Sequence, residues 1–199
     1  HPLRGQNNVQ GASDSGLIPM FYPDYQRVAT PEAKARFEKY WGTRLDPDPG
    51  LTVVEIMGAA LKGDIRGMYV MGENPAMSDP DLAHARAALS RLDHLVVQDI
   101  FLTETAKYAD VVLPATTAFE IEDVSTAYGS TYVQPVHAVI ERVGESRSND
   151  EVGLALARAM GYDWSPSPAR SVIDDPGPRR VTFPTMQFVD TTPGAARDH

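Results

Sequence analysis

The chain has 199 residues, of which 42% are hydrophobic and 23% are charged, a composition typical of a globular protein with one sizeable core. Its formal net charge of −9 argues against nucleic acid or an anionic membrane surface as a partner. The chain has no cysteine, which excludes disulfides and any iron–sulfur cluster held by its own thiolates. No apolar run approaches the roughly 18–20 residues of a membrane-spanning helix.

Helices and short strands are predicted to alternate along most of the chain. Residues 1–30 are rich in Gly, Asn, Gln and Pro and lack periodicity, which predicts a loop. Helices are predicted at 31–45, 51–61, 80–93, 103–109 and 150–160, and buried strands at 68–71, 95–97 and 111–113. This alternation indicates an α/β fold, a Rossmann-like parallel sheet with flanking helices.

Small or polar residues follow the predicted strands. Gly72, Glu73 and Asn74 come after the first strand, and Gln98 and Asp99 come after the second. Because ligands of open parallel sheets bind beyond the carboxyl ends of the strands, these residues form a candidate nucleotide site. Glycine lets a ligand approach the backbone, and a carboxylate can accept two donors, for instance from a guanine edge. A generic α/β core with polar loops explains the same pattern equally well.

Other polar positions have both a local and a functional interpretation. Ser78 or Asp79 is predicted to cap the helix at 80–93, whose amino terminus would then favour phosphate. Asn149 is predicted to cap the helix that follows it. The acidic residues Glu120, Glu122 and Asp123 are interpreted as a solvated loop rather than a metal site.

Three long motifs carry a family resemblance. HPLRGQNNVQG at the amino terminus, MGENPAMSDPD after the first strand and LVVQDIFLTETAKYADVVLPA further on resemble the catalytic subunit of molybdenum- or tungsten-dependent formate dehydrogenases, in the molybdopterin oxidoreductase superfamily. The resemblance implies that the chain is an internal fragment of a longer subunit. It implies an active-site segment at 1–30, a dinucleotide-binding domain at 31–164, and a linker at 165–199 leading to a β-barrel domain that is not in this chain.

The resemblance also assigns roles to individual residues. Arg4 matches the arginine that lies next to the metal and orients formate, although an isolated arginine is more often a solvated surface residue. Gln6 matches a residue near the pterin, and Ala115 a small residue against the cofactor. Ser148 and Asn149 match a helix start that contacts the cofactor. No residue of this chain is implied as a metal ligand.

The function implied by the resemblance is the two-electron oxidation of formate to CO2 at Mo or W. The cofactor would be molybdopterin guanine dinucleotide, with a 4Fe–4S cluster bound elsewhere in the full-length protein, and other electron-transfer subunits as partners. A cytoplasmic location is expected, and the fragment alone is expected to be inactive. Residues 127–152 resemble other superfamily members more closely, so a nitrate-reductase-like or other oxidoreductase is an alternative. A non-catalytic nucleotide-binding α/β domain is another.

Overall fold

The computed structural model describes residues 9–125, 132–163 and 179–180. Contacts divide the chain into two compact units, one formed by His1–Gly50, Glu122–His137 and Pro166–His199, the other by Leu51–Ile121 and Ala138–Ser165. Within the described ranges, no helix is long and apolar enough to cross a membrane. The boundaries expected at residues 30 and 164 stay predictions.

A parallel sheet of three strands forms the centre of the second unit. Strands β3 (Gly67–Met71), β4 (His94–Asp99) and β5 (Val111–Pro114) lie in the order β3-β4-β5. The three predicted strands and their parallel arrangement are therefore confirmed. Each observed strand extends the predicted run by one to three residues, because backbone pairing continues beyond the apolar run.

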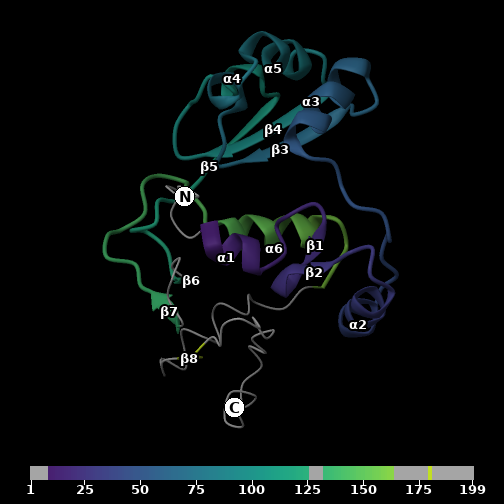
Figure 1. Cartoon of the computed structure of the whole chain (residues 1–199). Coiled ribbons are helices and arrows are strands. Elements are labelled where there is room, and N and C mark those ends of the chain that lie inside the picture. Colours follow the sequence, from purple (N-terminus) through teal and green to yellow (C-terminus); the bar gives the residue numbers. More distant parts are fainter. Residues whose placement is uncertain (1–8, 126–131, 164–178, 181–199) are drawn as a thin grey trace. The chain divides into compact units, whose positions relative to one another are not determined.

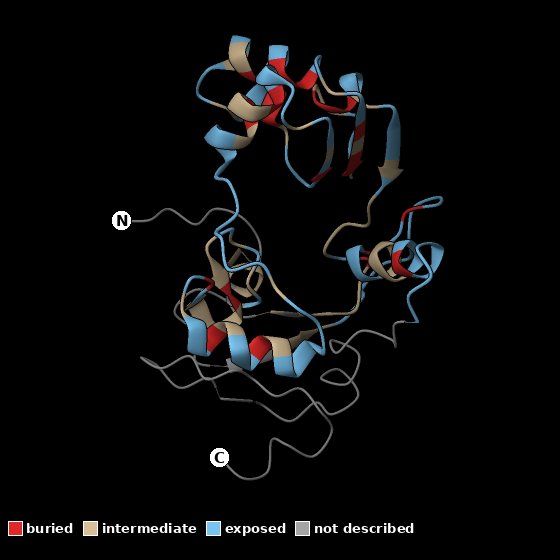
Figure 2. Cartoon of the chain, turned by 90° about the vertical axis from the view of Figure 1, so that its right-hand side faces the viewer, coloured by how far each residue is buried: buried red, intermediate tan, exposed pale blue. Residues whose placement is uncertain are grey.

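One face of this sheet carries the core of the unit. Figure 1 shows α3, α4 and α5 together on one side of the strands. The helical elements of the unit are α3 (Val53–Lys62), α4 (Pro75–Ser78), α5 (Leu82–Leu89), the 3-10 turn η2 (Ala106–Tyr108) and α6 (Asn149–Ala159). The core cluster joins Val70, Leu95 and Val97 of the strands to Ala76 and Leu89 of the helices. The buried residues gather where the helices meet the strands (Figure 2).

The opposite face of the sheet is far less covered. Side chains alternate between the two faces along a strand, so Tyr69, Met71 and Val111 face away from the core cluster. All three are exposed, whereas Gln98 on the same face is completely buried. A buried amide on an otherwise exposed face needs partners of its own, and these lie at the candidate site.

The helix ends show how local sequence signals act. Thr52 and Glu55 form a reciprocal capping box at the start of α3, and Gly63 ends the helix with a φ of +87°. The predicted helix at 51–61 is thereby confirmed within two residues at each end.

The predicted helix at 80–93 is shorter than expected, and neither Ser78 nor Asp79 caps it. Ser78 is the last residue of α4, and the cap of α5 is Asp81, whose carboxylate accepts the His84 N–H at 3.0 Å. Pro80 explains the break, because a residue before proline is disfavoured in the helical region and Asp79 is extended. The phosphate site predicted at Ser78 therefore has no helix start to support it.

The first unit contradicts the prediction of a loop at 1–30 in its described part. Val9–Asp14 forms α1, and β1 (Phe21–Tyr22) pairs with β2 (Gln26–Arg27) around the 3-10 turn η1 (Pro23–Tyr25). These elements are too short for periodicity to reveal. Helix α2 (Pro31–Trp41) begins where the helix predicted at 31–45 begins, but it ends earlier, at Gly42.

Aromatic packing forms the core of the first unit. The Tyr22 ring lies 4.9 Å from the Phe37 ring, centroid to centroid, and Val28 and Ala33 complete the buried cluster. This unit also contains the antiparallel strands β6 (Asp123–Ser125), β7 (Tyr132–Val136) and β8 (Arg179–Arg180), which were not predicted. The strand expected near 181–189 lies outside the described residues.

Candidate functional site

The carboxyl ends of β3, β4 and β5 meet at one edge of the sheet, here called the strand-end edge. The Gly72 N–H donates to the Gln98 carbonyl oxygen at 2.9 Å, and the Ala115 N–H donates to the Asp99 carbonyl oxygen at 3.0 Å. These bonds continue the parallel pairing past the strand ends. The predicted site residues after all three strands are thus brought to one place.

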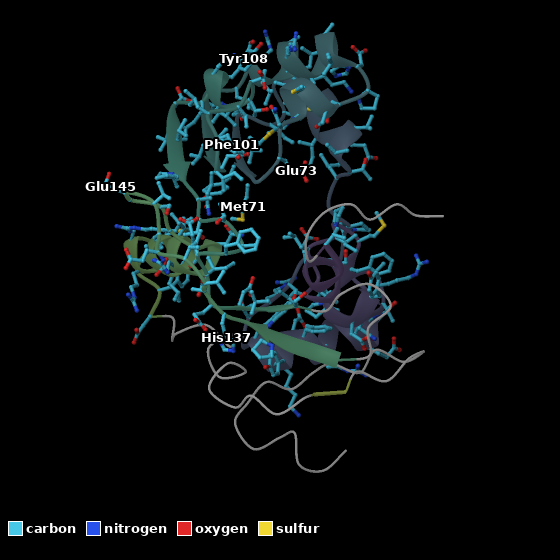
Figure 3. All side chains as sticks on the ribbon, turned by 90° about the vertical axis from the view of Figure 1, so that its left-hand side faces the viewer. Met71, Glu73, Phe101, Tyr108, His137 and Glu145 are labelled. Atoms are coloured by element: carbon cyan, nitrogen blue, oxygen red, sulfur yellow. The ribbon has the colours of Figure 1, made fainter. Side chains whose placement is uncertain are left out.

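Gly72 has the backbone conformation that favours glycine. Its φ is +65°, and no atom lies within 4 Å of the position that a Cβ would occupy. The left-handed turn therefore explains the residue type, and the open space above Gly72 leaves its backbone accessible to a ligand. Glu73 follows in the same loop and is exposed (Figure 3).

Asn74 joins two of the segments that form this edge. Its side-chain oxygen accepts the N–H of Thr105 at 3.1 Å and the Thr105 hydroxyl at 2.7 Å, and its amide nitrogen donates to Glu104 at 3.0 Å. The hydrogen bond from Asn74 holds the pKa of Glu104 below its ordinary value. The Asn74 side chain is thus engaged within the protein and shapes the edge, and its predicted contact with a cofactor remains a prediction.

Gln98 is engaged in the same way. Its side chain is completely buried, its oxygen accepts a hydrogen bond from the Tyr69 hydroxyl, and its nitrogen donates to the Asn149 oxygen at 2.7 Å. The sequence predicted that this amide would donate to and accept from a ligand. The oxygen and one N–H of this amide are used inside the protein, so Gln98 holds the edge in shape, and its predicted contact with a cofactor remains a prediction.

Asp99 retains unused acceptor capacity. Its Oδ1 accepts the Phe101 N–H at 3.1 Å, and no described residue donates to Oδ2. The Phe101 and Leu102 side chains that follow are 73% and 74% exposed. A half-buried carboxylate beside exposed apolar side chains can accept N–H donors from a flat polar ring that packs on those side chains.

The start of α6 is attached to the end of β5. The Arg147 N–H donates to the Pro114 carbonyl oxygen at 3.1 Å, and the Thr116 N–H donates to the Arg147 carbonyl oxygen at 3.2 Å. The next residues, Ser148 and Asn149, therefore lie at the same edge as Ala115. The structure brings together the three positions that the family resemblance singled out from separate parts of the sequence.

Ser148, and not Asn149 as predicted, caps α6. Ser148 has an extended backbone, its hydroxyl accepts the Glu151 N–H, and its own N–H donates to the Glu151 carboxylate at 3.0 Å. Asn149 is the first helical residue, which frees its side chain from the capping role. Serine and asparagine are similar N-caps, so only the backbone geometry distinguishes them.

Carboxylates already occupy the positive end of the α6 dipole. Asp150 and Glu151 lie in the first turn, and Arg142 contacts both Glu151 carboxylate oxygens at 2.7–2.8 Å. Burial raises the pKa of Glu151, but hydrogen bonds from Ser148 and Arg142 outweigh it and hold that pKa below its ordinary value. This helix end therefore suits a neutral ligand group better than a phosphate.

Glu120 is a buried connection that the sequence interpretation missed. Its side chain is 4% exposed, and its two carboxylate oxygens accept the N–H groups of Thr117 at 2.6 Å and Val143 at 2.7 Å. The Thr117 N–H is the main reason that the pKa of Glu120 lies below its ordinary value. Glu120 is not part of a solvated loop, and the Thr-x-x-Glu spacing was the signal for its local bond.

Two predicted site residues, Arg4 and Gln6, lie outside the described residues. In the described ranges, no group of three or more His, Cys, Asp or Glu side chains is arranged to hold a metal ion. The candidate site within the described residues therefore comprises Gly72, Glu73, Asn74, Gln98, Asp99, Ala115, Ser148 and Asn149.

The chain is similar to known proteins over most of its length. It is 47% identical over 162 residues to the F420-dependent formate dehydrogenase subunit alpha of Methanocaldococcus jannaschii, covering 81% of this chain and 24% of that protein. It is 42% identical over 161 residues to the F420-dependent formate dehydrogenase 1 subunit alpha of Methanococcus maripaludis, covering 81% of this chain and 23% of that protein. The chain thus spans about a quarter of the length of these relatives.

The fold has a counterpart among solved structures. Acetylene hydratase from Pelobacter acetylenicus superposes with a TM-score of 0.51 and 25% sequence identity, covering 54% of this chain and 15% of that one. The family model for molybdopterin oxidoreductase matches residues 5–159, which include the whole strand-end edge. The chain belongs to the molybdopterin oxidoreductase family.

Proposed function

We propose that the chain is part of the catalytic subunit of a formate dehydrogenase, in which the strand-end edge binds one molybdopterin guanine dinucleotide. The observation that carries the proposal is the convergence of Gly72, Asp99 and Asn149 at one edge of a parallel sheet. Family membership supports a molybdopterin cofactor, and the similarity to formate dehydrogenase alpha subunits supports formate as the substrate.

The donor and acceptor groups of the edge fit a guanine nucleotide. Guanine presents adjacent N–H donors, and Asp99 has a carboxylate oxygen that no described residue uses. Gly72 leaves open space for close approach of the ligand to the backbone. Ala115 and the start of α6 border the same edge, whereas Gln98 and Asn74 hold it in shape.

The remaining roles concern the longer protein. When bound, the Mo or W of the cofactor supplies the two-electron redox chemistry. Arg4 would hold the carboxylate of formate in a bidentate contact and thereby orient its C–H bond, with Gln6 near the pterin. A 4Fe–4S cluster elsewhere in the subunit and further electron-transfer subunits would take up the electrons.

A second candidate is another reaction on the same cofactor, as in a nitrate-reductase-like enzyme. The likeness to a protein named acetylene hydratase favours keeping this candidate, because one fold hosts different substrates. In the second candidate, residues outside the strand-end edge would determine the substrate. Cofactor binding at the strand-end edge is therefore common to both candidate functions.

The test uses the full-length protein with three substitutions. Asp99→Ala is expected to lower bound molybdopterin guanine dinucleotide at least tenfold, about the effect of losing a charged hydrogen bond. Arg4→Ala is expected to retain the cofactor and lose formate turnover. Asp93→Ala is the control, because Asp93 is an exposed carboxylate that pairs with Arg66 at the opposite edge of the sheet.

The released nucleotide is quantified by mass spectrometry, nucleotide and metal are each expressed per mole of protein, and turnover is measured with formate. Normal cofactor content in Asp99→Ala would contradict the assigned guanine contact. A wild-type enzyme that binds the cofactor but turns over another substrate and not formate would favour the second candidate.

A further inference from the structure

We propose that Tyr69 is a positioning residue for the nucleotide: its hydroxyl orients the Gln98 amide, and Gln98 in turn holds Asn149 with its amino group directed to the ligand. This inference rests on the proposed nucleotide binding at the strand-end edge. It adds Tyr69, a residue inside a strand that no motif singled out, and it gives Gln98 an indirect role.

The relative positions of the three residues make this chain of hydrogen bonds possible. Tyr69 pairs with Val96 in the sheet register, so Gln98 lies two residues further along the neighbouring strand on the same face. The long Tyr69 side chain spans this diagonal and reaches the Gln98 oxygen. From the other side, the Gln98 nitrogen reaches Asn149 at 2.7 Å, across 51 positions of sequence.

Complete burial of Gln98 makes these bonds necessary. The Gln98 side chain has no exposed surface, so an amide atom without a partner could not turn to water instead. A buried polar group left without a hydrogen bond is strongly unfavourable. The two bonds therefore hold the amide in one orientation, and any change at Tyr69 is transmitted to Asn149.

The tyrosine sets the donor-to-acceptor direction of the hydrogen bonds that join Tyr69, Gln98 and Asn149. Burial raises the pKa of the Tyr69 phenol, so the hydroxyl stays protonated at neutral pH and is able to donate. The Gln98 oxygen then accepts, its nitrogen donates, and the Asn149 oxygen accepts. The Asn149 amino group is left as a donor, and it makes no hydrogen bond to another described residue.

The charges around Asn149 indicate what its amino group recognises. Asp150 and Glu151 carry negative charge in the same helical turn, and Arg142 is already paired with Glu151. A phosphate would be repelled at this point, whereas a neutral oxygen would accept the hydrogen bond without that cost. The ligand atom is therefore a hydroxyl or carbonyl oxygen of the nucleoside part.

The experiment is a double-mutant cycle in the full-length protein freed of cofactor, titrated calorimetrically with guanosine and with GDP. Tyr69→Phe removes only the hydroxyl and is expected to weaken guanosine binding about three- to tenfold. Asn149→Ala is expected to weaken it similarly, and Tyr69→Phe is expected to have no further effect in that background. GDP is expected to lose affinity by the same factors, because phosphate is not involved.

Tyr108→Phe is the matched control. Tyr108 has nearly the same exposure as Tyr69, 37% against 38%, and its hydroxyl makes no hydrogen bond to a described residue. Asn149→Asp serves as a second variant that keeps the acceptor for Gln98 and removes the amino donor at a helix position that tolerates Asp. It is expected to bind guanosine as weakly as Asn149→Ala, with an unchanged melting temperature.

The outcomes separate the two proposals. If wild type binds guanosine and Tyr69→Phe binds as tightly as Tyr108→Phe, the positioning role is wrong and the nucleotide site stands. Additive losses in the double variant would also overturn the positioning role, because Tyr69 would then act independently of Asn149. If wild type binds neither guanosine nor GDP and Asp99→Ala keeps its cofactor, the proposed nucleotide site itself falls.

Discussion

The side-chain oxygen of Asn74 accepts two hydrogen bonds from Thr105, one from its backbone N–H and one from its hydroxyl. Thr105 is completely buried and also accepts the N–H of Ala76 at 3.1 Å. Asn74 therefore connects the loop after β3 to the segment between β4 and β5. This connection holds two parts of the strand-end edge at a constant distance.

Asn74→Ala is expected to destabilise the protein by about 1–3 kcal/mol, because two buried donors of Thr105 lose their acceptor. Urea unfolding followed by circular dichroism measures the change. Ser90→Ala is the control, since it removes an exposed hydroxyl that bonds only within its own helix turn. Equal stability of the two variants would show that Thr105 finds other partners.

The acid sensitivity of the protein is expected to depend on Glu120. Its pKa lies below the ordinary value of 4.5, so its contribution to stability is present above pH 4.5 and is lost as the pH falls through the lower folded value. Glu120→Gln is expected to lower the melting temperature at pH 7 and to flatten its dependence on pH below 4.5.

Melting curves between pH 3 and pH 7 test this expectation. Glu145→Gln is the control, because Glu145 is exposed and lies two residues after Val143, the partner of Glu120 (Figure 3). A pH profile of Glu120→Gln that parallels wild type would mean that other carboxylates carry the acid response.

Gly72→Ala is expected to destabilise the protein by about 1–2 kcal/mol. The cost comes from the left-handed backbone, since no atom lies within 4 Å of the new methyl group. Gly58→Ala in α3 is the opposite case: its Cβ also meets open space and its φ is not positive, so a gain of up to about 1 kcal/mol is expected. Chemical denaturation of both variants tests the sign, and equal effects would disprove the conformational explanation.

Ser148→Ala is expected to cost about 1 kcal/mol by removing the cap of α6. The Glu151 N–H loses its acceptor, so amide hydrogen exchange in the first turn of α6 should accelerate. Thr52→Ala removes the cap of α3 and serves as a matched variant that should accelerate exchange in α3 alone. Unchanged exchange in α6 would show that Asp150 replaces the serine as acceptor.

The sequence was most informative where local physics decides the structure. The helix α3 ends at a glycine and begins at a Thr-x-x-Glu box, and both signals lie within a few residues of the helix they limit. The strands β3, β4 and β5 are short aliphatic runs, and the helical segments between them require a parallel arrangement. The motifs around Gly72 and Gln98 also indicated the family.

Local signals were less reliable where more than one polar residue could cap the same helix. The cap of α6 is Ser148 rather than Asn149, and Pro80 moved the start of α5 from Ser78 to Asp81. Such choices depend on backbone angles that similar polar residues can share.

The tertiary structure alone decided how the polar side chains are used. Gln98 meets Tyr69 and Asn149 across 29 and 51 positions of sequence, and Glu120 meets Val143 across 23. No periodicity or capping pattern encodes such distances, because chain segments meet there only after the sheet has formed. The amino-acid sequence by itself thus determined the three strands of the parallel sheet, most helices and the family, whereas folding decided which amides and carboxylates support the site and which can face a ligand.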